Sequence, residues 1–254
     1  MLNIINLTKT FNPGTSYELR IFNDFNLHIN KGECTGILGA NGCGKTTLFN
    51  IISGVLRQEK GTVSLNGKNI DQLKENERAR FIGRVHQNPS AGVSPSLTIL
   101  ENISLSDKKC QIFTLRKLIN KQKIESYREI LKTLDLGLEN KLNTEVKYLS
   151  GGQRQSLSLL MATMNKPELL LLDEHTAALD PKTSRLEMEK TQELIKSYNI
   201  TTMMISHNVR DAVKYSDRII MLDKGEIILD VRSGQITEKE LLNIYNSRNY
   251  GSPL

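Results

Sequence analysis

A glycine-rich segment constrains this chain more than any other part of its sequence. The segment consists of Gly39, Ala40, Asn41, Gly42, Cys43, Gly44, Lys45 and Thr46, with Thr47 behind it. An apolar stretch, residues 34–38, precedes it, and an amphipathic stretch, residues 48–56, follows it. The glycines therefore fall where a strand has to turn into a helix, which is the context of a phosphate-binding loop.

The chemistry of this segment fits a polyphosphate. Glycines let successive backbone N–H groups point into one cavity, and the helix that starts near Lys45 adds the positive end of its dipole. Lys45 would reach the β- and γ-phosphates, and the hydroxyl group of Thr46 would be a ligand of a bridging magnesium ion. The alternative is a glycine-rich turn that ends in Gly-Lys-Thr by chance, which the flanking periodicity disfavours.

Composition places the chain among globular proteins. Its 254 residues are 38% apolar, enough for one large domain or two small ones. The longest apolar runs, such as residues 169–172, are far shorter than the roughly 18 residues of a membrane-spanning helix. Residues 1–11 contain no hydrophobic signal core, so we expect the protein to stay in the cytoplasm. Cys34, Cys43 and Cys110 have the spacing of neither a disulfide framework nor a zinc site and are interpreted as free thiols.

The net charge of +6 is concentrated in one segment. Residues 106–147 contain ten Lys or Arg against six Asp or Glu, a net +4. Six of these basic residues lie in its first half, namely Lys108, Lys109, Arg116, Lys117, Lys121 and Lys123. Two interpretations remain open, namely a solvated helical face and a surface close to lipid headgroups or to an acidic loop of a partner.

The first part of the chain predicts strands around the glycine-rich segment. Residues 1–35 alternate as antiparallel strands around a loop at 12–14, and Phe11, just before the loop, is either a core aromatic or a platform for an adenine ring. A helix is expected over 46–57, and a strand over 61–66 turns at Asn66-Gly67 and returns to the N-terminal sheet. A short helix over 71–80 and a strand over 82–86, ending at Gln87, follow.

From residue 88 the pattern becomes helical. Helices are predicted over 96–105 and 115–134, before a second set of strands at 169–172, 201–205, 218–222 and 226–231. Asp180-Pro181 is a favoured helix start, Lys224-Gly225 a hairpin turn, and Thr237 with Glu240 a capping box on a terminal helix. Strands that alternate with helices predict a parallel sheet interrupted by one helical subdomain.

Two carboxylates follow the buried strand 169–172. Asp173 would hold magnesium through water, and Glu174 would polarise an attacking water molecule. The alternative for two acids at a strand end is a turn or a helix cap. The long apolar run before them favours a strand edge that faces a ligand crevice.

A second motif stands before this strand, and it consists of Leu149, Ser150, Gly151, Gly152 and Gln153. Ser150 and the two glycines open an apolar helix and present N–H groups as a second anion site. The pentapeptide resembles the signature of the ATP-binding subunits of ABC transporters. One chain has no evident need for two such helix ends on one nucleotide. The resemblance implies a head-to-tail homodimer in which each signature covers the γ-phosphate held by the other chain.

Other motifs of that family occur in the same order. Gln87 matches the glutamine that senses magnesium and the attacking water, so that Thr46, Gln87 and Asp173 form the implied metal site. Residues 177–180, which end in Asp180, match the loop that crosses the dimer seam, and His207 matches the switch histidine that contacts the γ-phosphate. The resemblance thus implies Glu174, His207 and Gln87 as catalytic residues.

The resemblance also implies a fold, an α/β P-loop NTPase of the ABC-ATPase type. It combines a mostly parallel RecA-like core sheet with an N-terminal antiparallel β subdomain and an inserted α-helical subdomain. Residues 1–254 would form a single ATP-binding domain, with the core and its β subdomain at 1–87 and 166–254 and the helical subdomain, including the signature, at 88–165.

Two positions depart from the family pattern. Cys43 stands where a small, unreactive residue is usual, and a thiol at a helix N-terminus beside a lysine is expected to have a lowered pKa. The alternative is a thiol that merely replaces a small residue and is shielded by the fold. His175 follows Glu174 where many relatives carry proline. This variant, together with residues 8–15, resembles a bacterial subgroup of uptake systems often assigned to tryptophan or tyrosine.

These observations predict an ATPase that uses ATP and Mg²⁺ and works as a homodimer on the cytoplasmic face of the cell membrane. Its expected partners are transmembrane permease subunits and, through them, an extracellular substrate-binding lipoprotein, with no nucleic acid. Three alternatives remain, namely a soluble ABC-family ATPase acting on nucleic acid or ribosomes, an exporter ATPase, and a small-molecule kinase.

Overall fold

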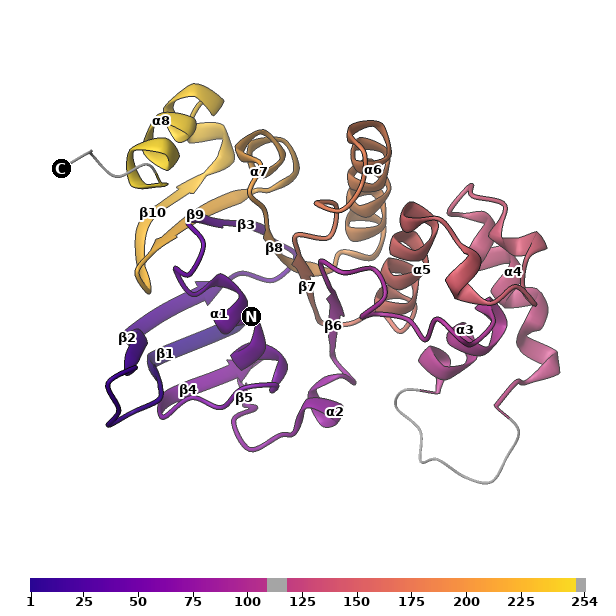
Figure 1. Cartoon of the computed structure of the whole chain (residues 1–254), viewed down its shortest axis with the longest axis horizontal. Helices are drawn as coiled ribbons and strands as arrows, with labels where there is room; N and C mark the ends of the chain where they lie inside the picture. The colour runs from indigo at the N-terminus through magenta and orange to yellow at the C-terminus, as the bar shows by residue number, and fades with distance from the viewer. Residues whose placement is uncertain (109–117, 250–254) are drawn as a thin grey trace. The chain divides into compact units, whose positions relative to one another are not determined.

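The computed structural model describes residues 1–108 and 118–249. The chain forms two compact units (Figure 1). The first unit combines Met1–Arg78 with the described part of Ile200–Leu254, and the second lies within Ala79–Asn199. The predicted division into a core at 1–87 and 166–254 and a helical subdomain at 88–165 stays a prediction. Among the described residues, no helix is long and apolar enough to cross a membrane.

An antiparallel sheet forms one layer of the first unit. Its strand order is β2 (Leu19–Ile29), β1 (Leu2–Phe11), β4 (Lys60–Leu65), β5 (Lys68–Asn69). The two-residue turn between β4 and β5 needs positive φ at both positions, and Asn66 and Gly67 supply it with φ of 50° and 77°. The predicted N-terminal antiparallel strands and their turn are confirmed.

A mostly parallel sheet forms the second layer of this unit. β3 (Cys34–Gly39) pairs in parallel with β8 (Thr201–Ile205) and β9 (Arg218–Asp223), and β10 (Glu226–Arg232) pairs antiparallel with β9. All six residues of β3 are buried, as expected of a central parallel strand. The helices α7 (Val209–Tyr215) and α8 (Glu238–Asn249) contribute Val209, Ala212 and Leu241 to a core shared with this sheet.

The second unit contains the helical insert. Its strands β6 (Ile82–Val85) and β7 (Leu169–Asp173) pair in parallel. Its helices are α3 (Ile99–Asp107), α4 (Ile124–Lys132), α5 (Gly151–Thr163) and α6 (Pro181–Tyr198), with 3₁₀ turns at Lys121–Lys123, Leu138–Asn140 and Val146–Tyr148. One apolar core joins α3, α4 and α5 through residues such as Ile99, Leu131 and Leu157.

The helix that follows the glycine-rich segment is shorter than expected. α1 (Lys45–Ser53) ends four residues before the predicted end at 57, because Gly54 has a left-handed backbone with φ of 86°. Arg78, only 1% exposed, closes the same end by donating from Nη1 to the carbonyl oxygens of Ile51 at 2.7 Å and Ile52 at 3.0 Å. This buried cap comes from α2 (Glu75–Arg78), which is all that forms of the predicted helix over 71–80.

Two other helix predictions need correction. Of the predicted helix over 115–134, residues 115–117 lie outside the described part, residues 118–120 are not helical, and α4 begins only at Ile124. The side chain of Asn120 accepts a hydrogen bond from the N–H of Gln122 and thereby starts the 3₁₀ turn that precedes α4. The predicted helix at 96–105 begins at Ile99, because Thr98 and Glu101 form a capping box.

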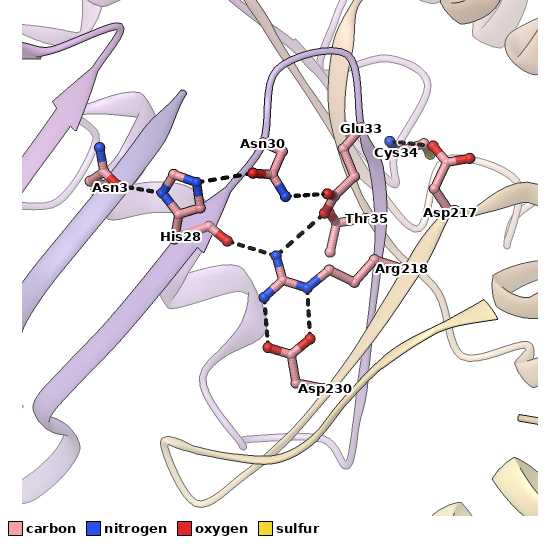
Figure 2. A network of polar contacts seen from close by, with 9 residues as sticks. All are labelled: Asn3, His28, Asn30, Glu33, Cys34, Thr35, Asp217, Arg218 and Asp230. Carbon is pink, nitrogen blue, oxygen red and sulfur yellow. Dashed lines mark hydrogen bonds and ion pairs between the residues drawn. The ribbon is translucent and has the colours of Figure 1, made fainter. Parts of the chain in front are cut away.

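A polar network ties the end of β2 to β3, β9 and β10 within the first unit (Figure 2). Arg218 forms a two-pronged pair with Asp230, with Nε–Oδ1 and Nη2–Oδ2 distances of 2.6 Å each. Its Nη1 donates to the carbonyl oxygen of His28 at 2.8 Å and to Oε1 of Glu33 at 3.4 Å. Asn30 in turn donates from Nδ2 to Oε2 of Glu33 at 2.6 Å.

Because of this network, we expect Asp230→Asn to lower the free energy of unfolding by a measurable amount. The substitution removes the charge of a bidentate pair whose Arg218 side chain is 18% exposed and whose Asp230 side chain is 41% exposed. Because the carboxylate is partly solvated, we expect the free energy of unfolding in urea to fall by only about 1 kcal/mol. The matched control is Glu129→Gln, which breaks the exposed Lys132–Glu129 pair and should leave the free energy of unfolding unchanged within error. Equal effects of the two substitutions would contradict the importance of the network.

Candidate functional site

The glycine-rich segment forms the predicted turn between β3 and α1. Gly39, Gly42 and Gly44 have φ of 148°, 80° and 111°, which L side chains rarely adopt. A Cβ atom at Gly39 would lie 2.3 Å from the carbonyl oxygen of Leu222, and one at Gly44 would lie 2.9 Å from Cζ of Phe22. The backbone path of this loop therefore depends on glycine at both ends.

The loop presents the donors that a phosphate needs. Gly44 caps α1 without a side-chain hydrogen bond, so no side chain of the cap competes for the N–H groups of the first helical turn. Lys45 is 5% exposed, and its Nζ donates to the carbonyl oxygens of Gly39 at 2.7 Å and Ala40 at 2.9 Å. Thr46 is exposed and Thr47 half-buried. The ammonium group is thus held inside the curve of the loop.

The expectation of a lowered pKa at Cys43 is wrong. Its thiol is 4% exposed, and burial raises the pKa above the ordinary value. The positive charge of Lys45, whose Nζ lies 3.9 Å from the sulfur, acts in the opposite direction but is the smaller effect. The structure thus agrees with a shielded thiol in place of a small residue, because little thiolate is present at neutral pH.

Phe11 lies at the end of β1 and is half-buried. The ammonium group of Lys9 lies 5.4 Å from the centre of its ring. Adenine stacking at Phe11 stays a prediction.

In the second unit, Gln87 and Glu174 are brought together. Glu174 follows β7 with a positive φ of 47°, an unusual backbone for a residue with a side chain. Nε2 of Gln87 donates to Oε2 of Glu174 at 2.8 Å, although the two are 87 positions apart. Amide donation to one carboxylate oxygen fixes the orientation of the other, as is useful for a group that has to polarise water.

The last residue of β7, Asp173, is 7% exposed. Its Oδ2 pairs with Nη2 of Arg84 on β6 at 3.1 Å. The sequence predictions did not include Arg84. Arg84 could have been predicted from its place as a charged residue in the middle of the apolar strand Ile82–Val85. A buried carboxylate on a neighbouring strand needs such a residue to compensate its charge.

His175, the second departure from the family pattern, is a buried neutral residue. It is 2% exposed, and its Nε2 lies 3.3 Å from Oγ1 of Thr191 on α6. Burial lowers the pKa of His175 to about 4. The imidazole therefore carries no charge at neutral pH, and its position beside Glu174 adds no cation to the site.

The residues predicted as the signature and as the dimer-seam loop both lie at helix starts, where Ser150 caps α5 and Asp180 caps α6. Oγ of Ser150 accepts from the N–H of Gln153 at 3.2 Å, and Oε1 of Gln153 accepts from the N–H of Ser150 at 3.1 Å, which is a full capping box at the start of α5. A Cβ at Gly152 would lie 2.8 Å from Cγ2 of Thr183, so α5 and α6 approach closely there. Asp180 caps α6 by accepting from the N–H groups of Lys182 and Thr183. A hydrogen bond from the Thr183 side chain, together with these backbone bonds, lowers the pKa of its carboxyl.

His207 lies in the first unit between β8 and α7. Its side chain is exposed, and its Nδ1 lies 3.4 Å from the hydroxyl oxygen of Tyr245 on α8. The predicted switch histidine is therefore accessible at the carboxyl end of a parallel strand, which is where ligands bind in such sheets.

The donors expected at the metal suit magnesium. Thr46, Gln87 and Asp173 offer hydroxyl, amide and carboxylate oxygen atoms, the hard ligands that Mg²⁺ prefers. Among residues 1–108 and 118–249, no group of three His, Cys, Asp or Glu side chains could hold a metal ion.

The basic segment is only partly described. Lys108, Lys121 and Lys123 are described, and Nζ of Lys123 pairs with Oδ2 of Asp107 at 2.6 Å. Lys109, Arg116, Lys117 and Cys110 lie outside the described residues. Both interpretations of the charge stay open.

Comparison with known proteins points in one direction. A sequence model of the family described as ABC transporter matches residues 22–177. The chain is 44% identical over 244 residues to a tyrosine transport ATP-binding protein of Clostridioides difficile (strain R20291), with 96% of both chains covered. It is 36% identical over 228 residues to a choline transport ATP-binding protein of Bacillus subtilis (strain 168), with 90% of this chain and 56% of the relative covered.

Solved structures agree. A dimeric ATP-binding cassette in a post-hydrolysis state with ADP and Pi matches with a TM-score of 0.77 and 30% identity, over 92% of this chain and 99% of the other. A nucleotide-free cassette from an ABC transporter matches with a TM-score of 0.78 and 25% identity, over 96% and 94%. These likenesses confirm the fold class expected from the sequence.

The buried His175 predicts a pH-dependent stability. An unfolded chain takes up a proton near the ordinary pKa of 6.5, whereas the folded protein does so only near 4, so the free energy of unfolding falls as the pH drops between these values. We expect a loss of about 2 kcal/mol between pH 7 and pH 5 in urea unfolding followed by circular dichroism. His175→Gln, which does not titrate, should remove most of that loss. Parallel curves for the two proteins would show that His175 is not its source.

Proposed function

The chain belongs to the ABC transporter family and is an ATP-binding, ATP-hydrolysing subunit of it, and from this premise we propose that it powers the uptake of an aromatic amino acid by ATP-driven closure of a homodimer. The support for the cargo is the tyrosine transport relative, which is similar along nearly the whole chain. The choline transport relative is less similar, so the cargo is the part of the proposal that depends most on a single likeness.

The loop at residues 39–47 is proposed to hold the triphosphate. Its left-handed glycines expose backbone N–H groups at the start of α1, and the buried ammonium group of Lys45 supplies the positive charge. In this proposal Lys45 exchanges its hydrogen bonds to Gly39 and Ala40 for bonds to phosphate oxygens. Phe11 is proposed to stack on the adenine ring.

Hydrolysis is assigned to Glu174, oriented by Gln87. The 2.8 Å hydrogen bond from Gln87 orients the Glu174 carboxylate, which is proposed to accept a proton from the attacking water. Thr46, Gln87 and Asp173 are proposed to hold Mg²⁺, which when bound neutralises charge on the β- and γ-phosphates. The pair with Arg84 fixes the Asp173 carboxylate, which would help to hold the ion.

Closure of the dimer is assigned to groups that act across the seam. Ser150, Gly151, Gly152 and Gln153 are proposed to cover the γ-phosphate held by the second chain, with Asp180 at the seam and His207 at the γ-phosphate. A dimeric structure of a similar cassette supports this assembly. Closure follows from differential affinity, because contacts that span both chains exist only in the closed state.

The remaining partners are proposed from family membership. The protein would act with transmembrane permease subunits at the cytoplasmic face of the membrane, and an extracellular substrate-binding lipoprotein would deliver the cargo to the permease. The helical insert in the second unit, beginning after Gln87, is proposed to receive the permease.

Glu174→Gln tests the catalytic assignment. The amide keeps the shape of the side chain and cannot take a proton, so we expect ATP hydrolysis to fall by about a hundredfold or more. ATP should then hold the variant as a dimer, seen as a doubled mass by light scattering after size exclusion. Glu226→Gln, which removes an exposed carboxylate on β10, is the control and should behave as the wild type. Wild-type turnover or a persistent monomer for Glu174→Gln would refute the assignment.

Lys45→Ala tests the phosphate loop. Loss of a charge-assisted contact to the phosphates should weaken ATP binding by about a hundredfold or more in calorimetry. Lys31→Ala changes an exposed lysine on the turn before β3 and should leave the affinity unchanged. An unchanged affinity in Lys45→Ala, with the fold checked by circular dichroism, would place the nucleotide elsewhere.

A further inference from the structure

A cavity of about 340 Å³ lies among α4, α5 and α6 in the second unit, and none of its lining residues is among those assigned to ATP. Its size is at the lower end of the range for small-molecule sites. The walls are mainly apolar, with Ile130, Leu134, Leu159, Leu160, Met164 and Leu194 among the lining residues. The helices that form it are labelled in Figure 1.

A buried carboxylate lines this apolar cavity. Glu187 on α6 is 3% exposed. Its Oε2 accepts a hydrogen bond from the hydroxyl group of Ser156 on α5. Its other oxygen, Oε1, is buried and has no hydrogen-bond partner among the described residues. A buried acceptor without a donor is costly, and most such groups in native proteins are satisfied.

The nearest cation of the lining is engaged elsewhere. Nζ of Lys190, one turn along α6, donates to the carbonyl oxygen of Leu134. Burial raises the pKa of Glu187, and the charge of Lys190 offsets this effect only in part. A positively charged donor placed at Oε1 would satisfy the unpaired oxygen and favour the charged carboxylate at the same time.

The charge of the lining also favours a cation. Glu187 and Glu193 contribute two carboxylates against the single ammonium group of Lys190. We propose that this cavity is a binding site for a small compound with an ammonium group and an apolar body, with the ammonium donating to Oε1 of Glu187 and the apolar part filling the space between the leucine side chains. A neutral or anionic compound of the same shape would lack the first of these contacts.

The cavity lies between α5 and α6, two helices whose first residues are proposed to act at the dimer seam. α5 begins after Ser150 and α6 begins after Asp180, so a ligand held between them would contact both helices that carry dimer-seam residues. An effect of such a ligand on dimer closure rests on the proposed function. Binding itself does not, and it is therefore tested without nucleotide.

The experiment uses the full chain and three probes of nearly equal shape, namely 2-phenylethylamine, 2-phenylethanol and phenylacetate. Binding is measured by isothermal calorimetry and by chemical-shift changes of the methionine methyl groups, among which Met164 lines the cavity. We expect saturable binding of the amine with a shift at Met164, and binding of the alcohol and the acid weaker by about tenfold or more. Equal affinities for the three probes, or no saturable binding of the amine, would overturn the proposal.

Variants locate the binding. Glu187→Gln should weaken binding of the amine by about tenfold and leave the affinity for the alcohol unchanged. Leu194→Trp fills the cavity without touching the carboxylate and should abolish binding of both probes, which keeps the test valid if Glu187→Gln folds poorly. Glu189→Gln removes the same charge from an exposed position on α6 outside the lining and is the matched control, with a change of less than about twofold expected. A loss in Glu189→Gln equal to that in Glu187→Gln would show long-range attraction between charges and would overturn the proposed site.

Discussion

The glycine-rich loop at residues 39–47 passes close to two other segments of the chain. The first unit depends on this close approach. At Gly39 the backbone runs so near the carbonyl group of Leu222 on β9 that a Cβ would come within 2.3 Å of it. The turn after β9 holds the loop again, because the N–H of Gly225 donates to the carbonyl oxygen of Cys43 at 3.1 Å. A Cβ at Gly225 would meet the carbonyl oxygen of Ile21 at 1.7 Å, so β2 presses on this turn in the same way. The loop is thus shaped by strands on both sides of it in the sequence.

Features that rest on local chemistry could be predicted from the sequence. The turn at Asn66-Gly67, the start of α6 at Asp180 and the capping box of Thr237 with Glu240 each need only a residue type at a fixed short spacing. The end of α1 could not be predicted in this way, because the cap comes from Arg78, 27 positions beyond Ile51. α7 was missed although Val209 and Ala212 have helical spacing, since a helix of seven residues gives a weak periodic signal.

In the candidate site, too, the residue types could be predicted from the sequence, but the contacts between distant residues could not. Residue types and motif order indicated Gln87 and Glu174 separately, but not the 2.8 Å hydrogen bond that joins them, because pairing of β6 with β7 decides which side chains meet. The pKa of Cys43 was misjudged for a related reason. The sequence shows the lysine and the helix start, which lower the pKa, but not the depth of burial, which raises it and is the larger effect. A sequence shows which charged residues are close along the chain. It does not show how deeply a side chain is buried, and the desolvation that shifts a pKa depends on that burial.

Desolvation also explains why three buried polar groups of the second unit behave differently. Asp173 pairs with the guanidinium group of Arg84 across two paired strands. His175 has a hydroxyl neighbour, Oγ1 of Thr191, and burial keeps its imidazole neutral at neutral pH. Glu187 has a hydroxyl donor for one oxygen and, in the part of the chain that the structure describes, none for the other, and burial raises the pKa of its carboxyl. The first arrangement is complete within the chain and so is the second. The third is complete only when a donor enters from outside, because a buried acceptor gains most from the hydrogen bond that the fold has left unmade.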